Sequence, residues 1–263
     1  MGILNNTVEP YRSMRGTHLF HAPPSNCSQR VRLALEEKGV RWTSHLVILA
    51  RNEHLMPEYQ LLHPGGVVPV LVHDGRVVIE SNDIIQYIDK TYPGPSLTPA
   101  SGTEQTNLEG LLSLSTDLQV SLKLLSYTHL YAHRIRKPPE EMAKYARLQQ
   151  NKALVAWQQR FNDDDFSAAE LEAARAKFVA ALEILEDSLI NQAWLSGEYY
   201  GLADISWTVN VHRAQLLDLR KPGLLGLAQH KRVTDWLKRT RQRPSYDKAL
   251  TAYEPEWSES EKF

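Results

Sequence analysis

The pattern of apolar positions changes its period along the chain, from strand-like runs mixed with helices to helices alone. Before residue 93, four short apolar runs are typical of β-strands: 17–21, 42–49, 67–72 and 77–79. Helical spacing follows Ser25 and Ser81, and each serine is suited to cap the helix after it. Asp74-Gly75 separates the last two runs and favours a tight hairpin turn. The order strand, helix, strand, hairpin, helix predicts a small α/β unit.

Helical spacing alone continues after a stretch rich in proline, glycine and serine. We predict a boundary at this stretch and an all-α domain after it, which gives the fold class α/β plus all-α. The predicted order is an N-terminal extension, an α/β domain, a linker, a helical domain and a C-terminal tail: 1–16, 17–92, 93–104, 105–250 and 251–263.

Local signals predict where several helices of the second half begin and end. Leucines between Leu108 and Leu122 follow one long amphipathic period. Pro138-Pro139 followed by two glutamates predicts a helix start, because proline and acidic side chains suit a first turn. Ser167-Ala168-Ala169-Glu170 is a capping-box sequence. A last helix is expected over 231–241, before Pro244.

Composition narrows the classes of function. The chain has 263 residues with 30 basic and 31 acidic side chains, so its formal net charge is −1 and no strong field favours nucleic acid or an anionic membrane. We find no signal-peptide core and no apolar run of about 18 residues, so we expect no membrane span. The single cysteine, Cys27, excludes an intramolecular disulfide and suits a reducing compartment. We expect a cytoplasmic protein that acts on a small molecule.

Ser25 and Cys27 stand between a predicted strand and a predicted helix. The first turn of a helix offers free N–H groups and the positive end of the helix dipole, which stabilise a thiolate of the protein or of a ligand. Either residue is therefore a catalytic candidate. The alternative is structural: Ser25 only caps the helix, and Cys27 is a small buried hydrophobic residue.

Val68-Pro69 lies in an apolar run just before the predicted hairpin, where proline is unusual for a central strand. A cis bond would explain this position and would leave the backbone of Val68 exposed to pair with an extended ligand. The alternative is an edge strand with an ordinary trans proline.

Glu80-Ser81 precedes the second predicted helix of the α/β unit. A carboxylate beside a hydroxyl and a helix start suits the head group of an α-amino acid. Glu80 would pair with the ammonium group, while Ser81 and the helix end would hold the carboxylate. A capping serine beside a surface acid is the alternative.

Together these segments resemble the glutathione transferase superfamily, over about residues 17–250. Ser25–Leu35, which reads SNCSQRVRLAL, resembles the zeta-class pattern Ser-x-Cys-Ser-x-Arg-Val-Arg-x-Ala-Leu and the reactive-cysteine segment of chlorinated-hydroquinone reductive dehalogenases. His63–Leu71 resembles Asn-Pro-x-Gly-x-Val-Pro-x-Leu, with histidine in place of asparagine. Gly201–Asp204 resembles the Ser/Thr-x-Ala-Asp helix cap, where the missing hydroxyl is expected to weaken one contact.

The resemblance implies a thioredoxin-like domain followed by a helical bundle, with glutathione as cosubstrate. Ser25 would donate a hydrogen bond to the glutathione sulfur, and Cys27 is the second catalytic candidate, as a nucleophile that resolves a mixed disulfide. The implied contacts are the glycyl carboxylate for His54, the cysteinyl backbone for Val68 beside Pro69, and the γ-glutamyl end for Glu80 and Ser81.

The resemblance also implies a hydrophobic, aromatic electrophile or ether as the second substrate, and a homodimer. Its pocket would be lined by five residues that the motifs define only weakly: Ala22, Pro23, Asn26, Tyr127 and Tyr131. His129 and His133 are one helical turn apart, but no third ligand is evident, so we expect no metal site.

Three functions stay open at this point. The first is a glutathione transferase that relies on Ser25. The second is a reductive dehalogenase or thiol reductase that relies on Cys27, or a zeta-like isomerase. The third is a non-catalytic glutathione-binding or interaction protein on the same fold, because an extra helical segment between 131 and 167 is a feature of some such proteins.

Overall fold

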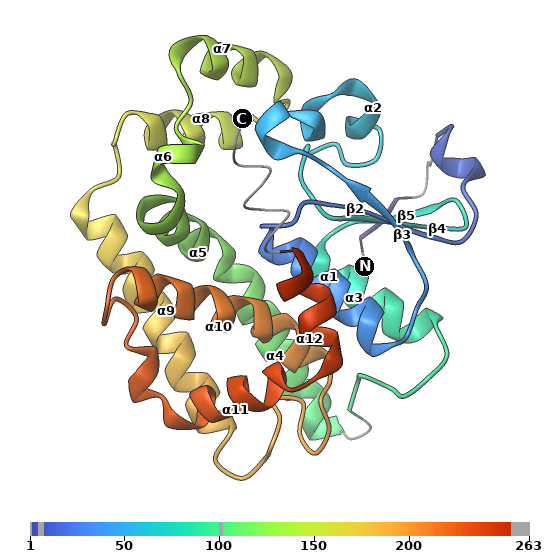
Figure 1. Cartoon of the computed structure of the whole chain (residues 1–263), viewed down its shortest axis with the longest axis vertical. Coiled ribbons are helices and arrows are strands. Elements are labelled where there is room, and N and C mark those ends of the chain that lie inside the picture. Colours follow the sequence, from blue (N-terminus) through green and yellow to red (C-terminus); the bar gives the residue numbers. More distant parts are fainter. Residues whose placement is uncertain (1, 5–7, 100–101, 254–263) are drawn as a thin grey trace. The chain divides into compact units, whose positions relative to one another are not determined.

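The computed structural model describes residues 2–4, 8–99 and 102–253. Ala100 and Ser101 of the predicted linker and residues 254–263 of the predicted tail lie outside the described residues. The chain clusters into two compact units, each of which is described by itself (Figure 1). Unit 1 comprises Met1–Tyr92, Arg136–Asp165 and Lys248–Phe263, and unit 2 comprises Pro93–Ile135 and Phe166–Asp247.

Unit 1 contains a mixed five-stranded sheet in the order β1-β5-β4-β2-β3. The strands are β1 (Ile3–Leu4), β2 (Thr17–His21), β3 (Thr43–Leu46), β4 (Val70–His73) and β5 (Arg76–Val78). β2 pairs in parallel with β3 and antiparallel with β4, and β4 forms the predicted hairpin with β5. The turn residues Asp74 and Gly75 both have positive φ, 48° and 79°, which is the geometry of a two-residue hairpin turn.

Three helices belong to the N-terminal part of unit 1: α1 (Asn26–Glu37), α2 (Pro57–Gln60) and α3 (Ser81–Thr91). Helices α1 and α3 pack against each other, and both bury an apolar face, with Val31, Leu35, Ile84 and Ile88 fully buried. The predicted order of strands and helices is therefore confirmed.

The N-terminal segment contributes to the sheet, which the sequence pattern did not predict. β1 pairs antiparallel with β5, with Ile3 opposite Val78. Tyr11 is buried, and its hydroxyl donates to the carbonyl of Glu58 at 2.8 Å. A strand of two residues is too short to show a period, so no alternation revealed it.

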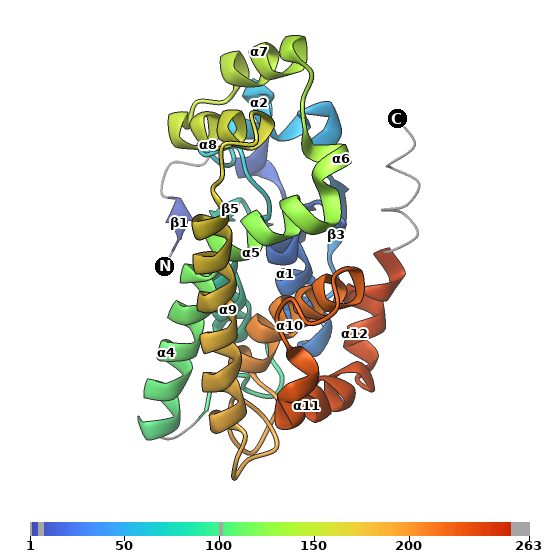
Figure 2. The ribbon, with the colours of Figure 1, turned by 90° about the vertical axis from the view of Figure 1, so that its left-hand side faces the viewer.

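Unit 1 also includes a distant part of the chain. Helices α7 (Pro139–Leu148) and α8 (Lys152–Asn162) follow the predicted helix start at Pro139, and they cluster with the N-terminal strands and helices. Figures 1 and 2 show α7 at the same end of unit 1 as α2, with α8 next to α7. The side-chain Nε2 of Gln60 in α2 donates to the carbonyl of Leu148 at 2.9 Å, so α2 and α7 are joined directly.

The described residues of unit 2 form helices joined by loops, with one isolated β-bridge between Trp194 and Gly197. Its helices are α4 (Gly102–Asp117), α5 (Gln119–Ser126), α6 (Ala132–Ile135), α9 (Ala168–Ser188), α10 (Leu202–Arg220), α11 (Lys231–Arg241) and α12 (Pro244–Ala249), which ends just inside unit 1. The single long helix predicted through Leu108–Leu122 is instead divided at Leu118. The capping box of Ser167 and Glu170 begins α9 as predicted.

Asp204 organises the core of unit 2. Its buried carboxylate accepts hydrogen bonds from the backbone N–H of Leu195, Ser196 and Gly201 and from the indole of Trp236, at 2.8–3.0 Å. This confirms the predicted helix cap at the start of α10. Gly201 has no hydroxyl to accept a hydrogen bond from the first turn of α10. Ser196 Oγ takes this role and accepts from the N–H of Ala203 at 3.1 Å.

Position 201 has no room for a side chain, so glycine is required there. A Cβ there would lie 2.3 Å from the carbonyl oxygen of Leu97 and 2.8 Å from Ser196 Oγ.

Within the described residues, no helix is both long and apolar enough to cross a membrane.

Candidate active site

Ser25 and Cys27 lie at the N-terminus of α1, as predicted. Ser25 is the N-cap residue, and its Oγ accepts from the N–H of Ser28 at 3.3 Å. Cys27 is the second residue of the helix and is half-buried. Both side chains therefore lie where free N–H groups and the helix dipole stabilise negative charge.

Arg30 joins this helix start to the start of α3. Its guanidinium is almost fully buried, and Nη1 donates to Ser81 Oγ at 2.7 Å. Burial lowers the pKa of Arg30, and charge on Cys27, one helical turn earlier, acts in the opposite direction. One side chain therefore connects Cys27 with the hydroxyl that was predicted to bind a γ-glutamyl carboxylate.

Glu80 has an unusual backbone conformation. Its φ of 65° and ψ of 111° are rare for a residue with a side chain. This geometry precedes the first residue of α3 and leaves the carboxylate 67% exposed, 4.0 Å from Nε2 of His63. Strained backbone of this kind concentrates at ligand-binding positions, and binding of a γ-glutamyl group by Glu80 stays a prediction.

The loop before β4 carries the Val68–Pro69 peptide bond, which is cis. β4 is a central strand and begins at Val70, so the edge-strand interpretation is wrong and Pro69 lies outside the hydrogen-bonded ladder. Earlier in the same loop, Gly66 has a φ of 57°. A Cβ there would lie 2.9 Å from Leu55 Cδ2 and 3.0 Å from the carbonyl oxygen of His54. Glycine thus allows this loop to contact the segment of His54.

His54 lies in the 3₁₀ turn Glu53–Leu55 and is half-buried. Its Nδ1 is buried and has no hydrogen-bond partner among the described residues. Burial, together with the positive charge of Lys137, lowers the pKa of His54 to about 4. The imidazole is therefore neutral at pH 7, and the described residues leave the hydrogen-bonding capacity of its buried Nδ1 unused.

Arg32 binds the loop that precedes Ser25 through hydrogen bonds to backbone carbonyls. Ala22 is buried, and its carbonyl and that of Pro23 face the Arg32 guanidinium at 3.4 and 3.1 Å. Asn26, the first residue of α1, is also buried. The predicted pocket residues Ala22, Pro23 and Asn26 thus belong to an ordered segment around the helix start.

Tyr127 and Tyr131, the other predicted pocket residues, lie in unit 2. They begin and end a π-helical segment, Tyr127–Tyr131, a feature that is rare and often found at functional sites. Tyr131 is buried, with Arg213 5.2 Å from its ring centroid. His129 lies in the same segment, and no group of three possible metal ligands occurs among the described residues.

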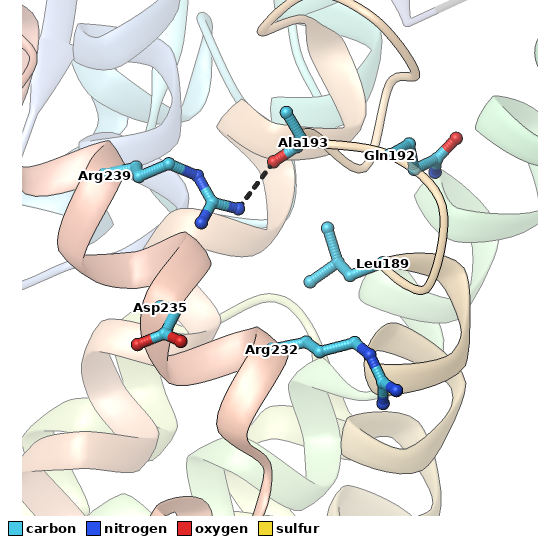
Figure 3. Close-up of a pocket in the computed structure, with 6 residues that line it drawn as sticks. All are labelled: Leu189, Gln192, Ala193, Arg232, Asp235 and Arg239. Carbon is cyan, nitrogen blue, oxygen red and sulfur yellow. Dashed lines mark hydrogen bonds between the residues drawn. The ribbon is translucent and has the colours of Figure 1, made fainter.

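A surface cavity of about 340 Å³ in unit 2 does not include any predicted site residue. Figure 3 shows it between the loop after α9 and helix α11. Its two arginines already have partners: Arg239 donates to the carbonyl of Ala193 at 2.8 Å, and Arg232 pairs with Glu186 at 3.2 Å. The arginines that line the cavity are therefore already bound to protein groups, so we assign no role to this cavity.

Comparison with known proteins agrees with this geometry. Family models for the N-terminal and the C-terminal domain of glutathione S-transferases match residues 19–96 and 168–239. The chain belongs to the glutathione S-transferase family.

Three similar proteins illustrate the range of the family. "Glutathione S-transferase TCHQD" of Arabidopsis thaliana is 25% identical over 250 residues, which cover 91% of each chain. The "Tetrachloro-P-hydroquinone reductive dehalogenase" of Sphingobium chlorophenolicum is 26% identical over 87% of this chain and 96% of its own. The crystal structure of beta-etherase LigF from Sphingobium sp. strain SYK-6 has a TM-score of 0.80 at 22% identity and covers 89% of this chain and 98% of that one.

Three charged residues around the candidate site were not predicted from the sequence: Arg30, Arg32 and Lys137. Both arginines belong to the Arg-Val-Arg part of the family pattern, which could have marked them, whereas the spacing of apolar residues says nothing about a role for charged residues. Lys137 is separated from His54 by more than 80 positions in the sequence, and no local pattern predicts such a contact.

Proposed function

We propose that this protein is a glutathione transferase that uses Ser25 to stabilise the thiolate of glutathione for attack on a hydrophobic electrophile or ether. The observation that carries the proposal is the junction of two helix starts, where Arg30 of α1 donates to Ser81 of α3 at 2.7 Å. The N-terminus of α1 offers its dipole to a sulfur, and the N-terminus of α3 offers Ser81 to a carboxylate.

The proposed binding mode places glutathione along unit 1. Glu80 and Ser81 hold the γ-glutamyl end, the backbone of Val68 pairs with the cysteinyl residue, and His54 meets the glycyl carboxylate. Ser25 then donates its hydroxyl hydrogen bond to the glutathione sulfur. Catalysis consists of thiolate stabilisation and positioning, and the thiolate displaces a leaving group from the electrophilic carbon.

The test is binding followed by turnover. Calorimetry should detect glutathione binding, and a panel of aryl halides and aryl ethers should yield glutathione conjugates. Ser25→Ala should reduce kcat far more than it weakens glutathione binding. Absence of glutathione binding would refute the proposal, whereas full turnover in Ser25→Ala would assign the catalytic role elsewhere. Binding without turnover of any substrate would favour a non-catalytic protein of the same fold.

A Cys27-dependent reduction is the second candidate, because Cys27 lies in the first turn of α1 and one turn before the buried Arg30. These are surroundings in which protein thiols act as nucleophiles. The Cys27 thiolate would attack the sulfur of a glutathione conjugate, release the reduced substrate as a carbanion that takes a proton, and form a mixed disulfide. A second glutathione would then release Cys27 and leave as glutathione disulfide.

Mass spectrometry after turnover separates the two candidates. A glutathione adduct on Cys27 and loss of activity in Cys27→Ser would support the reduction. Unchanged activity in Cys27→Ser would support the Ser25-based transferase. We further propose a homodimer in the cytoplasm, for which the direct measurements are sedimentation and cell fractionation.

A further inference from the structure

The segment Arg136–Asp165, which interrupts unit 2 in sequence, is fastened to the proposed glutathione site of unit 1. Leu55, the residue after His54, packs in a buried cluster with Met142 and Tyr145 of α7. Helix α7 lies at the same end of unit 1 as α2 in both views and is bonded to it through Gln60 and Leu148 (Figures 1 and 2). The first turn of this segment is therefore held close to the turn that carries His54.

Lys137 is fixed at the entry to this segment. Its backbone N–H donates to the side-chain oxygen of Asn162 at 3.2 Å, and the side-chain nitrogen of Asn162 donates to the Lys137 carbonyl at 3.1 Å. The two prolines that follow Lys137 restrict the chain further. Lys137 Nζ lies 5.3 Å from the ring centroid of Tyr145, in the same cluster that contacts Leu55.

The surroundings of His54 and Lys137 favour a negatively charged ligand. His54 Nδ1 is buried without a hydrogen-bond partner among the described residues. Burial lowers the pKa of Lys137, and Glu141 opposes this shift. The carboxylate of Glu53, the residue before His54, accepts from the backbone N–H of Ile48 at 2.7 Å. Lys137 contacts Tyr145, which packs with Leu55, and its charge acts on His54. A cation held partly out of water and an unsatisfied imidazole together suit a carboxylate.

We infer that Lys137 binds the glycyl carboxylate of glutathione together with His54, so that the segment Arg136–Asp165 completes the binding site. This inference rests on the proposed function. The two residues divide the work: the neutral imidazole of His54 supplies a hydrogen bond, and Lys137 supplies the positive charge. The segment is thereby a part of the cosubstrate site and not only an addition to the helical domain.

The experiment compares glutathione with its glycine ethyl ester, which lacks the glycyl charge, by calorimetry. The unsubstituted protein should prefer glutathione, and Lys137→Met should reduce the ratio of the two affinities by about tenfold while leaving the ester affinity unchanged. Lys137→Arg, which keeps the charge, should preserve the ratio. Lys144→Met is the matched control, because Lys144 is an exposed lysine of α7.

A second measurement does not depend on glutathione. The pKa of His54, followed by NMR in the free protein, should rise in Lys137→Met and stay unchanged in Lys144→Met, because only Lys137 repels the imidazolium. An unchanged affinity ratio in Lys137→Met, or an unchanged pKa of His54, would overturn the role of Lys137. Failure of the unsubstituted protein to bind glutathione would instead overturn the proposed function on which the inference rests.

Discussion

Replacing Arg32 with methionine should destabilise unit 1 and slow turnover. The Arg32 side chain is fully buried, and its Nε donates to the carbonyl of Ala249 at 2.7 Å. Nη2 donates to the carbonyl of Pro23 at 3.1 Å, and Nη1 donates to Nδ1 of His21, also at 3.1 Å. Methionine keeps the apolar stem but removes every donor. The carbonyls of Ala249 and Pro23 and Nδ1 of His21 lose this partner, whereas the carbonyl of Ala22, 3.4 Å from Nη1, still accepts from the N–H of Ser25.

The expected loss follows from these three bonds. A buried acceptor left without a partner costs about 1–3 kcal/mol, while removal of the buried guanidinium returns part of its desolvation penalty. We therefore expect the free energy of unfolding to fall by about 3–5 kcal/mol. Arg32→Lys keeps a charge but has one donor centre, which cannot reach acceptors in three directions, so its loss should be nearly as large.

Urea unfolding at 25 °C, followed by circular dichroism and tryptophan fluorescence, measures this loss. Arg41→Met is the control, because Arg41 is exposed, and it should change the free energy of unfolding by less than about 0.5 kcal/mol. If Arg32→Met changed stability as little as the control, the three bonds would not stabilise unit 1 and the reasoning would be wrong.

Turnover provides a second readout of the same change. The carbonyl of Pro23 belongs to the loop that leads to Ser25, so release of this loop misplaces the proposed catalytic hydroxyl. Ser81 and Glu80 lie on α3 and are not held by Arg32. In Arg32→Met, kcat should therefore fall more than the affinity for glutathione, and an equal loss of both would refute this division.

Three further predictions concern stability. Burial and the neighbouring Arg32 lower the pKa of His21 to about 3. Between pH 6.5 and 3 the unfolded chain therefore binds a proton that the folded chain does not, so the free energy of unfolding should fall as the pH drops, by up to about 1.4 kcal/mol per pH unit. His21→Gln should flatten this pH dependence in urea titrations. Asp204→Asn should cost about 2–6 kcal/mol in urea, because two buried N–H donors lose their acceptor, whereas Asp187→Asn on the exposed face of α9 should change little. Gly201→Ala should lower the melting temperature strongly in calorimetry, because its Cβ meets a backbone carbonyl.

Local signals predicted most of the fold because they depend on neighbours in sequence. The hairpin at Asp74-Gly75 and the capping box at Ser167 are read from two to four adjacent residues, and both are present. The helix division at Leu118 was missed because leucine spacing runs through it without a break. The π-helical turn at Tyr127 was missed because its hydrogen bonds depend on packing more than on residue type.

The buried arginines mark a limit of pattern reading. On a helix, charged residues are expected on the solvent face, yet Arg30 and Arg32 are nearly or fully buried. Each buried arginine is tolerated because its N–H groups donate to acceptors outside its own helix. Arg30 donates to Ser81 Oγ, and Arg32 donates to the carbonyls of Pro23 and Ala249. Such acceptors become visible only in three dimensions, so the motif showed that these residues recur without showing why.

The parts of the proposed site differ in how far along the sequence their partners lie. Ser25 is set by its own helix start, and Glu80 by the first turn of α3, so short motifs identify both. Lys137 comes near the segment of His54 because α7 packs on Leu55, through a cluster that spans 90 positions from Leu55 to Tyr145, and Lys137 Nζ lies 5.3 Å from the ring centroid of Tyr145. Motifs therefore identify the proposed sulfur-binding and γ-glutamyl ends of the site, whereas the proposed glycyl end also depends on Lys137, which lies more than 80 positions from His54 in the sequence.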